Sequence, residues 1–253
     1  MTYPKVTLIW LNYNSSPIID LVKKSLDSLA NLDYPRYEII IVDNGSTDGS
    51  CREIKKFIDS SKFPYGVRVK IVKLDRNLGY TGGNTIGYRL RAKDAIYVAI
   101  VNNDCIVYPQ ALKDLIEYLE YDASIGAIQG IVAKLNEKIV DSAGGFIDEL
   151  LTLYFPYVGK HINAIAKPIY VSFVEGTFMI YRIRAVRKFL GENLFIPEGF
   201  MYFLEDVFNS LMLWNLGYKS IVIPRVVAEH ARRATLSRFR KSIKIDYYSV
   251  RNK

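Results

Sequence analysis

The stretch EIIIVDNGSTDGS, residues 38–50, decides the fold. It starts as an apolar, β-branched run of strand length and ends in a turn of small polar residues, where Asp48 can cap a following helix. Similar apolar runs lie at 6–11, 67–74 and 96–101. Segments with helical spacing follow them, at about 16–31, 49–60, 81–92 and 109–121. This alternation predicts an α/β fold with a parallel sheet, and the continuous apolar strands predict that helices cover both faces.

Polar residues come directly after each of these four strands. They are Asn12 to Asn14, Asp43 to Ser46, Asp75 to Asn77 and Asn102 to Asp104. In an open α/β sheet, ligands bind beyond the carboxyl ends of the strands. The sequence therefore predicts a ligand site at this edge.

Beyond about residue 125 the simple alternation ends. A Gly-rich turn occurs at 144–145, and an amphipathic helix is predicted over 205–216, ending at Gly217. A strand is predicted at 218–223 and is expected to stop at Pro224. No flexible linker or internal repeat divides the chain. We expect this second half to close a cleft over the ligand site at the strand edge.

The composition and charge restrict the class of protein. Half of the 253 residues are hydrophobic, which is enough for a full core, and the formal charge of +8 favours anionic partners. Basic residues concentrate near the end, at Arg232, Arg233, Arg238, Arg240, Lys241 and Lys244. This cluster is either a solvated helix face or a contact for lipid headgroups or phosphates.

The cysteines and apolar runs predict a location. Cys51 and Cys105 have the spacing of neither a disulfide framework nor a zinc site. The apolar run at 6–11 is too short for a signal core, and nowhere do about 18 apolar residues follow one another. We therefore expect a cytoplasmic protein.

Two segments of the strand edge are candidate nucleotide sites. The carboxylate of Asp43 can accept the ring N–H of uracil or thymine, or it can simply hold the turn that follows. The segment NLGYTGGN, residues 77–84, leads into a helix, and its glycines let the backbone approach a ligand or make a plain tight turn. It has neither the lysine of a P-loop nor dinucleotide-binding spacing, which disfavours an ATPase or an NAD-linked enzyme.

Asp104 and His230 are candidate metal ligands. Asp104 follows an apolar strand, a position where a carboxylate can hold a hard cation that bridges to a diphosphate. Because substrate phosphates complete the shell of Mg²⁺, one carboxylate and one distant ligand can suffice. His230 could be that ligand, although a lone histidine is more often structural.

Glu205 and Asp206 open the predicted helix at 205–216, after an aromatic loop at 197–203. Acids at a helix N-terminus are ordinary caps. A carboxylate beside a phosphate site is also what an acceptor hydroxyl needs for deprotonation. Spacing alone does not separate the two candidates.

With these motifs in order, the chain resembles the family-2 inverting glycosyltransferases of the GT-A fold, particularly the rhamnosyltransferase-like branch. The similarity covers nearly all of the 253 residues. It depends on VTLIWLNYN, IIIVDNGSTDGS, NLGYTGGNTIG, VNNDCIVYPQAL, VEGTFMIYR, FLEDVFNSLMLWNLGY and RVVAEH. A series of motifs is far more specific than any one of them.

The resemblance implies a fold and a set of roles. The fold is the Rossmann-like GT-A fold, with a mostly parallel central sheet covered by helices on both faces. Asp43 would recognise the pyrimidine, Asp104 would bind Mg²⁺ or Mn²⁺ with help from His230, and Asp206 would be the base, supported by Glu205. The donor would also be lined by Asn12, Tyr13, Asn14, Asn77, Gly82, Gly83, Asn84 and Asn103.

The resemblance also implies an organisation and partners. Residues 1–253 would form one catalytic domain, with a nucleotide-binding half at about 1–125, an acceptor half at about 126–235 and a basic segment at 236–253. The donor would be a UDP- or dTDP-sugar and the acceptor a glycan or a lipid-linked sugar. The basic segment would suit contact with the inner face of the cell membrane, and no nucleic-acid partner is expected.

Two departures from the family pattern leave a rival open. Asn102 stands at the first acidic position of the D-x-D element, and Asn209 stands where an acid often follows Asp206. The rival is a catalytically silent domain that binds a sugar nucleotide, since a fold does not guarantee chemistry. Retention of Asp104 and of the pair Glu205 and Asp206 argues against it. A nucleotidyltransferase is disfavoured because residues 6–14 lack a basic Gly-rich loop.

Overall fold

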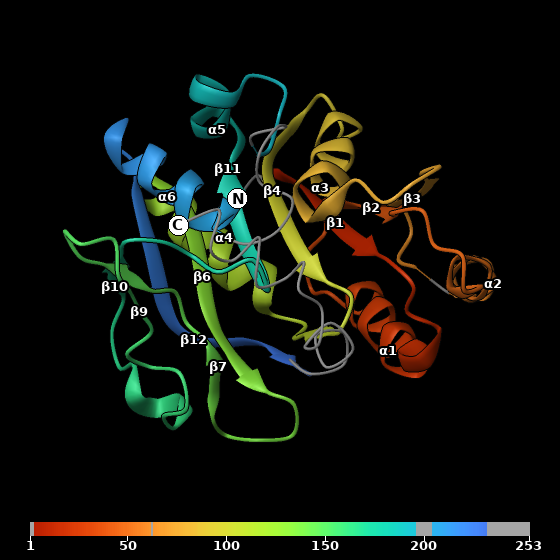
Figure 1. Ribbon diagram of the computed structural model, residues 1–253, viewed down its shortest axis with the longest axis horizontal. Coiled ribbons are helices and arrows are strands. Elements are labelled where there is room, and N and C mark those ends of the chain that lie inside the picture. The colour runs from red at the N-terminus through yellow and green to blue at the C-terminus, as the bar shows by residue number, and fades with distance from the viewer. Residues whose placement is uncertain (1–2, 62, 196–203, 232–253) are drawn as a thin grey trace.

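Four parallel strands form the first half of a central sheet (Figure 1). The structure is a computed structural model and describes residues 3–61, 63–195 and 204–231. The four strands are β1 (Lys5–Asn12), β2 (Tyr37–Asp43), β3 (Arg68–Lys73) and β4 (Ala95–Asn102). β1 pairs in parallel with both β2 and β4, and β2 pairs in parallel with β3. The four predicted strands are therefore confirmed.

Helices connect these strands close to the expected positions. They are the 3₁₀ helix η1 (Ser16–Ile18) and the α-helices α1 (Ile19–Ala30), α2 (Ser50–Ser60), α3 (Gly79–Arg89) and α4 (Ala111–Tyr121). The helix predicted to start at 109 begins at Ala111, so Pro109 precedes it rather than occupying its first turn. Asp48 accepts a hydrogen bond from the backbone N–H of Ser50 at 3.0 Å, at the start of α2.

The second half of the sheet is mixed. Its strands are β5 (Cys105–Val107), β6 (Ile125–Lys134), β7 (Val140–Ser142), β10 (Ile169–Val171), β11 (Phe178–Arg182) and β12 (Lys219–His230). The strand order is β10-β12-β6-β11-β4-β1-β2-β3, with β11 antiparallel to both of its neighbours and β12 parallel to β6. Small elements complete this half: β8 (Phe146–Ile147), β9 (Leu153–Tyr154) and the 3₁₀ helix η2 (Ile162–Ala164).

Helices cover both faces of the sheet, as the apolar strands predict. Alternate residues of a strand point to opposite faces. Leu8 and Trp10 of β1 join a core cluster with α1, α2 and α4. Ile9 joins a second cluster with α3, α5 (Ile183–Leu190) and α6 (Glu205–Asn215). Among the residues that the structure describes, none of the helices combines the length and the apolar character needed to span a bilayer.

The strand expected to stop at Pro224 does not stop there. β12 runs from Lys219 to His230, so this prediction is wrong. Proline has no N–H for the ladder and is tolerated in a strand at bulges. The pairing of β12 with β6 shifts register between Val222 and Val226, which places Pro224 in such an irregularity. The continuation carries His230 to the carboxyl edge of the sheet.

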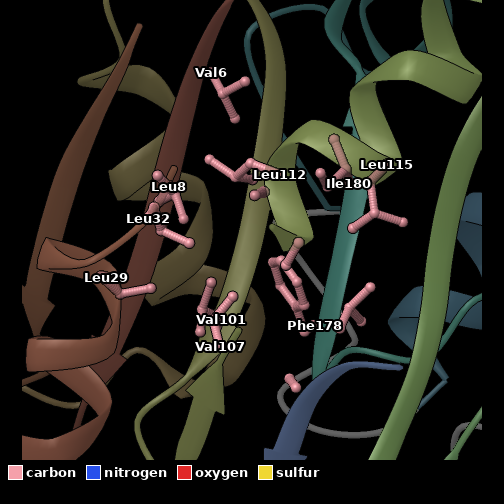
Figure 2. Packing of buried hydrophobic residues seen from close by; sticks show 14 of the residues in the cluster. Val6, Leu8, Leu29, Leu32, Val101, Val107, Leu112, Leu115, Phe178 and Ile180 are labelled. Atoms are coloured by element: carbon pink, nitrogen blue, oxygen red, sulfur yellow. The ribbon is translucent and has the colours of Figure 1, made fainter. Parts of the chain in front are cut away.

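Leu112 tests the packing of α4 against the sheet. It is fully buried, and Figure 2 shows it with Leu115 among strand residues of the first cluster. We expect Leu112→Ala to lower the free energy of unfolding by about 2–5 kcal/mol, because it leaves a cavity in a close-packed core. Tyr121→Ala, at a 92% exposed position of the same helix, is the matched control and should change it by less than about 0.5 kcal/mol. Equal urea midpoints for the two variants would contradict this packing.

Candidate active site

Asn12 and Asp43 are joined at the carboxyl ends of β1 and β2. The Asn12 Nδ2 donates to Asp43 Oδ1 at 2.7 Å, and the backbone N–H of Ser46 donates to Asp43 Oδ2 at 3.1 Å. Both side chains are buried. Asp43 Oδ2 therefore holds the turn while Oδ1 holds the end of β1, so the structural role that the sequence left open is present. Carboxylate oxygens can accept more than one hydrogen bond, so this geometry does not occupy their full capacity.

Asn14 ties the two strand-end loops together. Its backbone N–H donates to the Ser46 hydroxyl at 3.0 Å, and its Oδ1 accepts from the Thr47 N–H at 2.9 Å. Asn14 has a φ of 46°, the left-handed conformation that asparagine tolerates better than most residues. Tyr13 is partly exposed beside it, so this loop presents side chains at the edge.

The glycine segment shapes the start of α3. Asn77 Oδ1 accepts from the Asn44 amide at 2.9 Å and from the Gly79 N–H at 2.7 Å, which holds the turn. A Cβ on Gly82 would lie 2.7 Å from Leu78 Cβ, and a Cβ on Gly83 would lie 2.5 Å from Leu11 Cδ1. Gly83 therefore lets α3 pack closely on β1.

Asn84 lies inside α3, away from the strand ends. Its side chain is fully buried, and its Nδ2 donates to the Tyr80 carbonyl one turn earlier at 2.9 Å. Asn103, in contrast, reaches the strand edge. Its Nδ2 lies 3.4 Å from Asn12 Oδ1, which links the end of β4 to the end of β1.

Asp104 and His230 are neighbours although 126 residues separate them in the chain. β5 and β12 pair antiparallel with Cys105 opposite His230, which brings Asp104 alongside. Asp104 Oδ1 lies 3.0 Å from His230 Nε2, and both side chains are buried. Burial lowers the pKa of His230, but its hydrogen bonds to Asp104 and Asp141 outweigh that effect and raise the pKa to about 9.

Asp104 and His230 fit two ligands of one cation. Adjacent ligands of an octahedral ion with bonds of about 2.1 Å are about 3 Å apart, which matches the separation of Asp104 Oδ1 and His230 Nε2. Within the described ranges, no three or more histidine, cysteine, aspartate or glutamate side chains form a metal cage. Substrate phosphates and water can complete the shell of such an ion.

Glu205 and Asp206 begin α6 as predicted. Asp206 Oδ2 accepts from the Gly176 N–H at 3.0 Å, and its Oδ1 accepts from the Val207 N–H at 2.8 Å. Among the described residues, Glu205 Oε2 has no hydrogen-bond partner, although it is buried. The loop expected at 197–203 and the basic residues from Arg232 onward lie outside the described residues.

Burial and proximity perturb this acidic pair. Burial, and secondly the charge of Asp206, raises the pKa of Glu205 to about 8. Burial also raises the pKa of Asp206, against the lowering effect of its backbone hydrogen bonds. Neighbouring carboxyls with raised pKa values are typical of functional sites.

The segment 174–177 connects the acidic pair to the end of β4, the strand that precedes Asp104. The N–H of Asn102, at the end of β4, donates to the Thr177 carbonyl at 3.0 Å, while Gly176 donates to Asp206. The Tyr80 hydroxyl donates to the Gly176 carbonyl at 2.7 Å. The structure therefore brings Asp206, the start of α3 and the end of β4 together at one edge of the sheet.

Two acids in this region were not predicted from the sequence. Asp141 Oδ2 lies 2.7 Å from His230 Nδ1, and Glu175 Oε2 accepts from the Ser142 hydroxyl at 2.8 Å. Glu175 interrupts the apolar run at 169–181, and this pattern alone does not indicate a functional residue. Asp141 follows a short apolar pair ahead of a Gly-Gly turn, which gives no sign of a partner 89 residues away.

The doubly covered sheet, with its parallel first half, mixed second half and polar strand ends, has the architecture expected of the GT-A fold. The chain belongs to glycosyl transferase family 2, whose model matches residues 7–190. It is 30% identical over 135 residues to an uncharacterized glycosyltransferase of Haemophilus influenzae, covering 53% of this chain and 39% of the relative. It is 29% identical over 184 residues to the poly-β-1,6-N-acetyl-D-glucosamine synthase of Staphylococcus aureus, covering 72% and 40%.

Solved structures agree on the fold. The mannosyltransferase PcManGT from Pyrobaculum calidifontis, in complex with GDP-Man and Mn²⁺, matches 91% of this chain and 57% of its own, with a TM-score of 0.65 and 19% identity. S. aureus TarS 1–349 in complex with UDP-GlcNAc matches 89% and 58%, with a TM-score of 0.61 and 18% identity. The GT-A fold is thereby confirmed. The chain spans about 40% of the length of the curated relatives.

Proposed function

We propose that this chain is a metal-dependent, inverting glycosyltransferase that moves a sugar from a UDP- or dTDP-sugar to an acceptor hydroxyl. The observation that carries the proposal is the buried pair Glu205 and Asp206, joined through Gly176 and Thr177 to the end of β4. A nucleotide-sugar donor is supported by the complexes of two structures with this fold, TarS with UDP-GlcNAc and PcManGT with GDP-Man and Mn²⁺, of which the first supports a pyrimidine nucleotide. Membership of the rhamnosyltransferase-like branch is part of the proposal.

The nucleoside diphosphate lies along the ends of β1, β2 and β4. Asp43 takes the pyrimidine N–H with capacity left over from its turn, and Tyr13 and Asn14 border the nucleoside. The residues that shape this part of the site are Asn12, Asn77, Gly82, Gly83, Asn84 and Asn103. Several of them act through the backbone or through Asp43, because Asn12, Gly83 and Asn84 are buried.

Asp104 and His230 hold the cation, Mg²⁺ or Mn²⁺, in this proposal. Their candidate ligand atoms, Asp104 Oδ1 and His230 Nε2, are 3.0 Å apart. When bound, the ion neutralises the charge that develops on the leaving nucleoside diphosphate.

Asp206 is the general base. Two backbone N–H groups, of Gly176 and Val207, donate hydrogen bonds to its carboxylate and fix its orientation. It takes the proton of the acceptor hydroxyl while the hydroxyl oxygen bonds to the anomeric carbon and the bond to the nucleoside diphosphate breaks on the opposite side. Anomeric configuration is inverted in this single displacement. Glu205, buried beside Asp206 at the start of α6, is the supporting residue in this proposal.

The acidic pair sets a pH dependence. Because burial and the neighbouring carboxylate raise the pKa of Glu205 to about 8, the pair retains a proton near neutrality. Tyr80 and Tyr181, which face the pair, have pKa values well above their usual range and stay neutral. We expect kcat/KM to rise with pH and to level off above an apparent pKa near 8.

The variant Glu205→Gln tests whether the acidic pair causes this rise of kcat/KM with pH. The variant should lose the rise of kcat/KM near pH 8, because it removes the carboxyl group whose pKa is raised to about 8 and with it the proton that the pair retains. The measurement is a pH series with saturating metal in both proteins. An identical rise in wild type and variant would contradict the coupling.

The proposal also covers the acceptor and the location of the protein in the cell. A lipid-linked or cell-surface glycan at the inner face of the cell membrane suits the basic segment at 236–253, which lies outside the described residues. We place donor binding at about 1–125 and acceptor binding at about 126–235, within a single catalytic domain. The cytoplasmic location belongs to the same proposal.

A thermal-shift panel tests the donor class. UDP, dTDP and GDP, each with its sugars and with or without Mn²⁺ or Mg²⁺, should raise Tm in proportion to binding. The proposal expects UDP or dTDP to give the largest shift, and only with metal. A larger shift with GDP would reject the pyrimidine role of Asp43, and product NMR would separately test inversion at the anomeric carbon.

A further inference from the structure

Asp141 is a fully buried carboxylate that has no part in the proposed function. It lies on β7, between Val140 and Ser142, and its Oδ2 is 2.7 Å from His230 Nδ1. Burial of a carboxylate is costly unless the group is paired or hydrogen-bonded. The hydrogen bond to His230 offsets that cost, and both side chains of the pair are buried.

The backbone around Asp141 is held on both sides. β7 pairs antiparallel with β6, with Ser142 opposite Val132. The Glu175 carboxylate accepts from the Ser142 hydroxyl at 2.8 Å and from the Ala143 N–H at 3.1 Å. The Asp141 carboxylate therefore comes from a fixed strand.

The two nitrogens of the His230 ring face different carboxylates. Nδ1 lies 2.7 Å from Asp141 and Nε2 lies 3.0 Å from Asp104. An imidazole held at both ends can neither rotate nor flip. When the Nδ1–H of the neutral ring donates to Asp141, Nε2 carries the lone pair, and this lone pair points toward Asp104. Asp141 faces the opposite nitrogen and so stands outside the ligand set.

We propose that Asp141 is a positioning residue that selects the Nδ1–H tautomer of His230 and aims Nε2 at the cation. The inference depends on the proposed function, which makes His230 a metal ligand. Histidine ligands commonly donate their other ring N–H to a carboxylate, which fixes the ring and raises its basicity as a ligand. Asp141 supplies that carboxylate here, from a strand that carries no other proposed site residue.

Mn²⁺ binding in the presence of UDP, measured by calorimetry, tests the role without any activity assay. Asp141→Ala should raise the Kd for Mn²⁺ about 10-fold or more, the usual cost of losing such a partner. Asp141→Asn should recover most of that loss, because its amide oxygen can still accept from Nδ1–H. Glu229→Gln is the matched control: it removes a carboxylate one residue from His230 that contacts Tyr108 instead, and should leave the Kd unchanged.

His230→Ala separates this inference from the proposed function. Loss of Mn²⁺ binding in His230→Ala with unchanged binding in Asp141→Ala would overturn the role of Asp141 alone. Absence of Mn²⁺ binding in the wild type with UDP would overturn both. Equal losses in Asp141→Asn and Asp141→Ala, with Tm values like that of the wild type, would also overturn a role that depends on an oxygen acceptor.

The ring itself gives a second measurement if Asp141→Ala does not fold. In ¹⁵N NMR spectra of the wild type and Asp141→Asn with Mg²⁺ and UDP, His230 should carry its proton on Nδ1, and the Nε2 resonance should shift on addition of the metal. A proton on Nε2 in the metal-loaded wild type would contradict the proposal.

Discussion

Replacement of Asp206 by asparagine is expected to lower kcat for sugar transfer by about 10²–10⁴-fold, the usual contribution of a general base. Asparagine keeps the size of the side chain and an oxygen for the Gly176 N–H, which now lies 3.0 Å from Asp206 Oδ2, but it cannot take a proton. Steady-state transfer with a UDP- or dTDP-sugar is the measurement. UDP should bind with unchanged Kd, because the proposal places the nucleotide along β1, β2 and β4 and gives Asp206 no contact with it.

Glu192→Gln is the control for this loss. Glu192 is 57% exposed and pairs with Arg91 and Arg187 on the surface, where ion pairs contribute little to stability. Its removal should leave transfer at the wild-type level. Equal kcat values for Asp206→Asn and the wild type would remove Asp206 from the mechanism and leave Glu205 as the candidate base.

Asp104→Asn is expected to reduce transfer by about 100-fold or more, because loss of metal binding removes several kcal/mol of stabilisation of the leaving group. The carboxylate is also the partner of His230 Nε2 at 3.0 Å, so both proposed ligands are disturbed. Transfer should lose its dependence on Mn²⁺ concentration in this variant. The measurement is a Mn²⁺ titration of the rate.

Nucleotide binding distinguishes this loss from misfolding. UDP should bind Asp104→Asn as it binds the metal-free wild type, and added Mn²⁺ should no longer tighten it. If Mn²⁺ still tightens UDP binding and still activates transfer in Asp104→Asn, the cation is held elsewhere and the assignment of Asp104 is wrong.

Local patterns predicted the first half of the fold well. The strand expected at 38–42 corresponds to β2, Tyr37–Asp43, because an apolar β-branched run bounded by small polar residues has few other stable structures. The second half depends on pairings between distant segments. β11 lies antiparallel between β4 and β6, and no local pattern within Phe178–Arg182 encodes that position.

The candidate site divides in the same way. Asp43 ends β2 and Asp104 follows β4, and position alone made them candidates, whereas the pairing of Asp104 with His230 requires β12 to continue past Pro224. Pro224 pointed to the opposite conclusion, because the bulge that accommodates it is a tertiary feature. Asp141 gave no local signal, and only the structure brings it to His230.

Release of nucleoside diphosphate from a panel of UDP- and dTDP-sugars, with Mn²⁺ and with EDTA, tests the central claim most directly. A transferase of this kind hydrolyses its donor slowly even without an acceptor, and transfers the sugar faster when an acceptor is present. We predict release with Mn²⁺, none with EDTA and none in Asp206→Asn. A protein that binds the nucleotide with Mn²⁺ but releases no product from any donor, with or without acceptor glycans, would be a sugar-nucleotide-binding domain and would contradict the account.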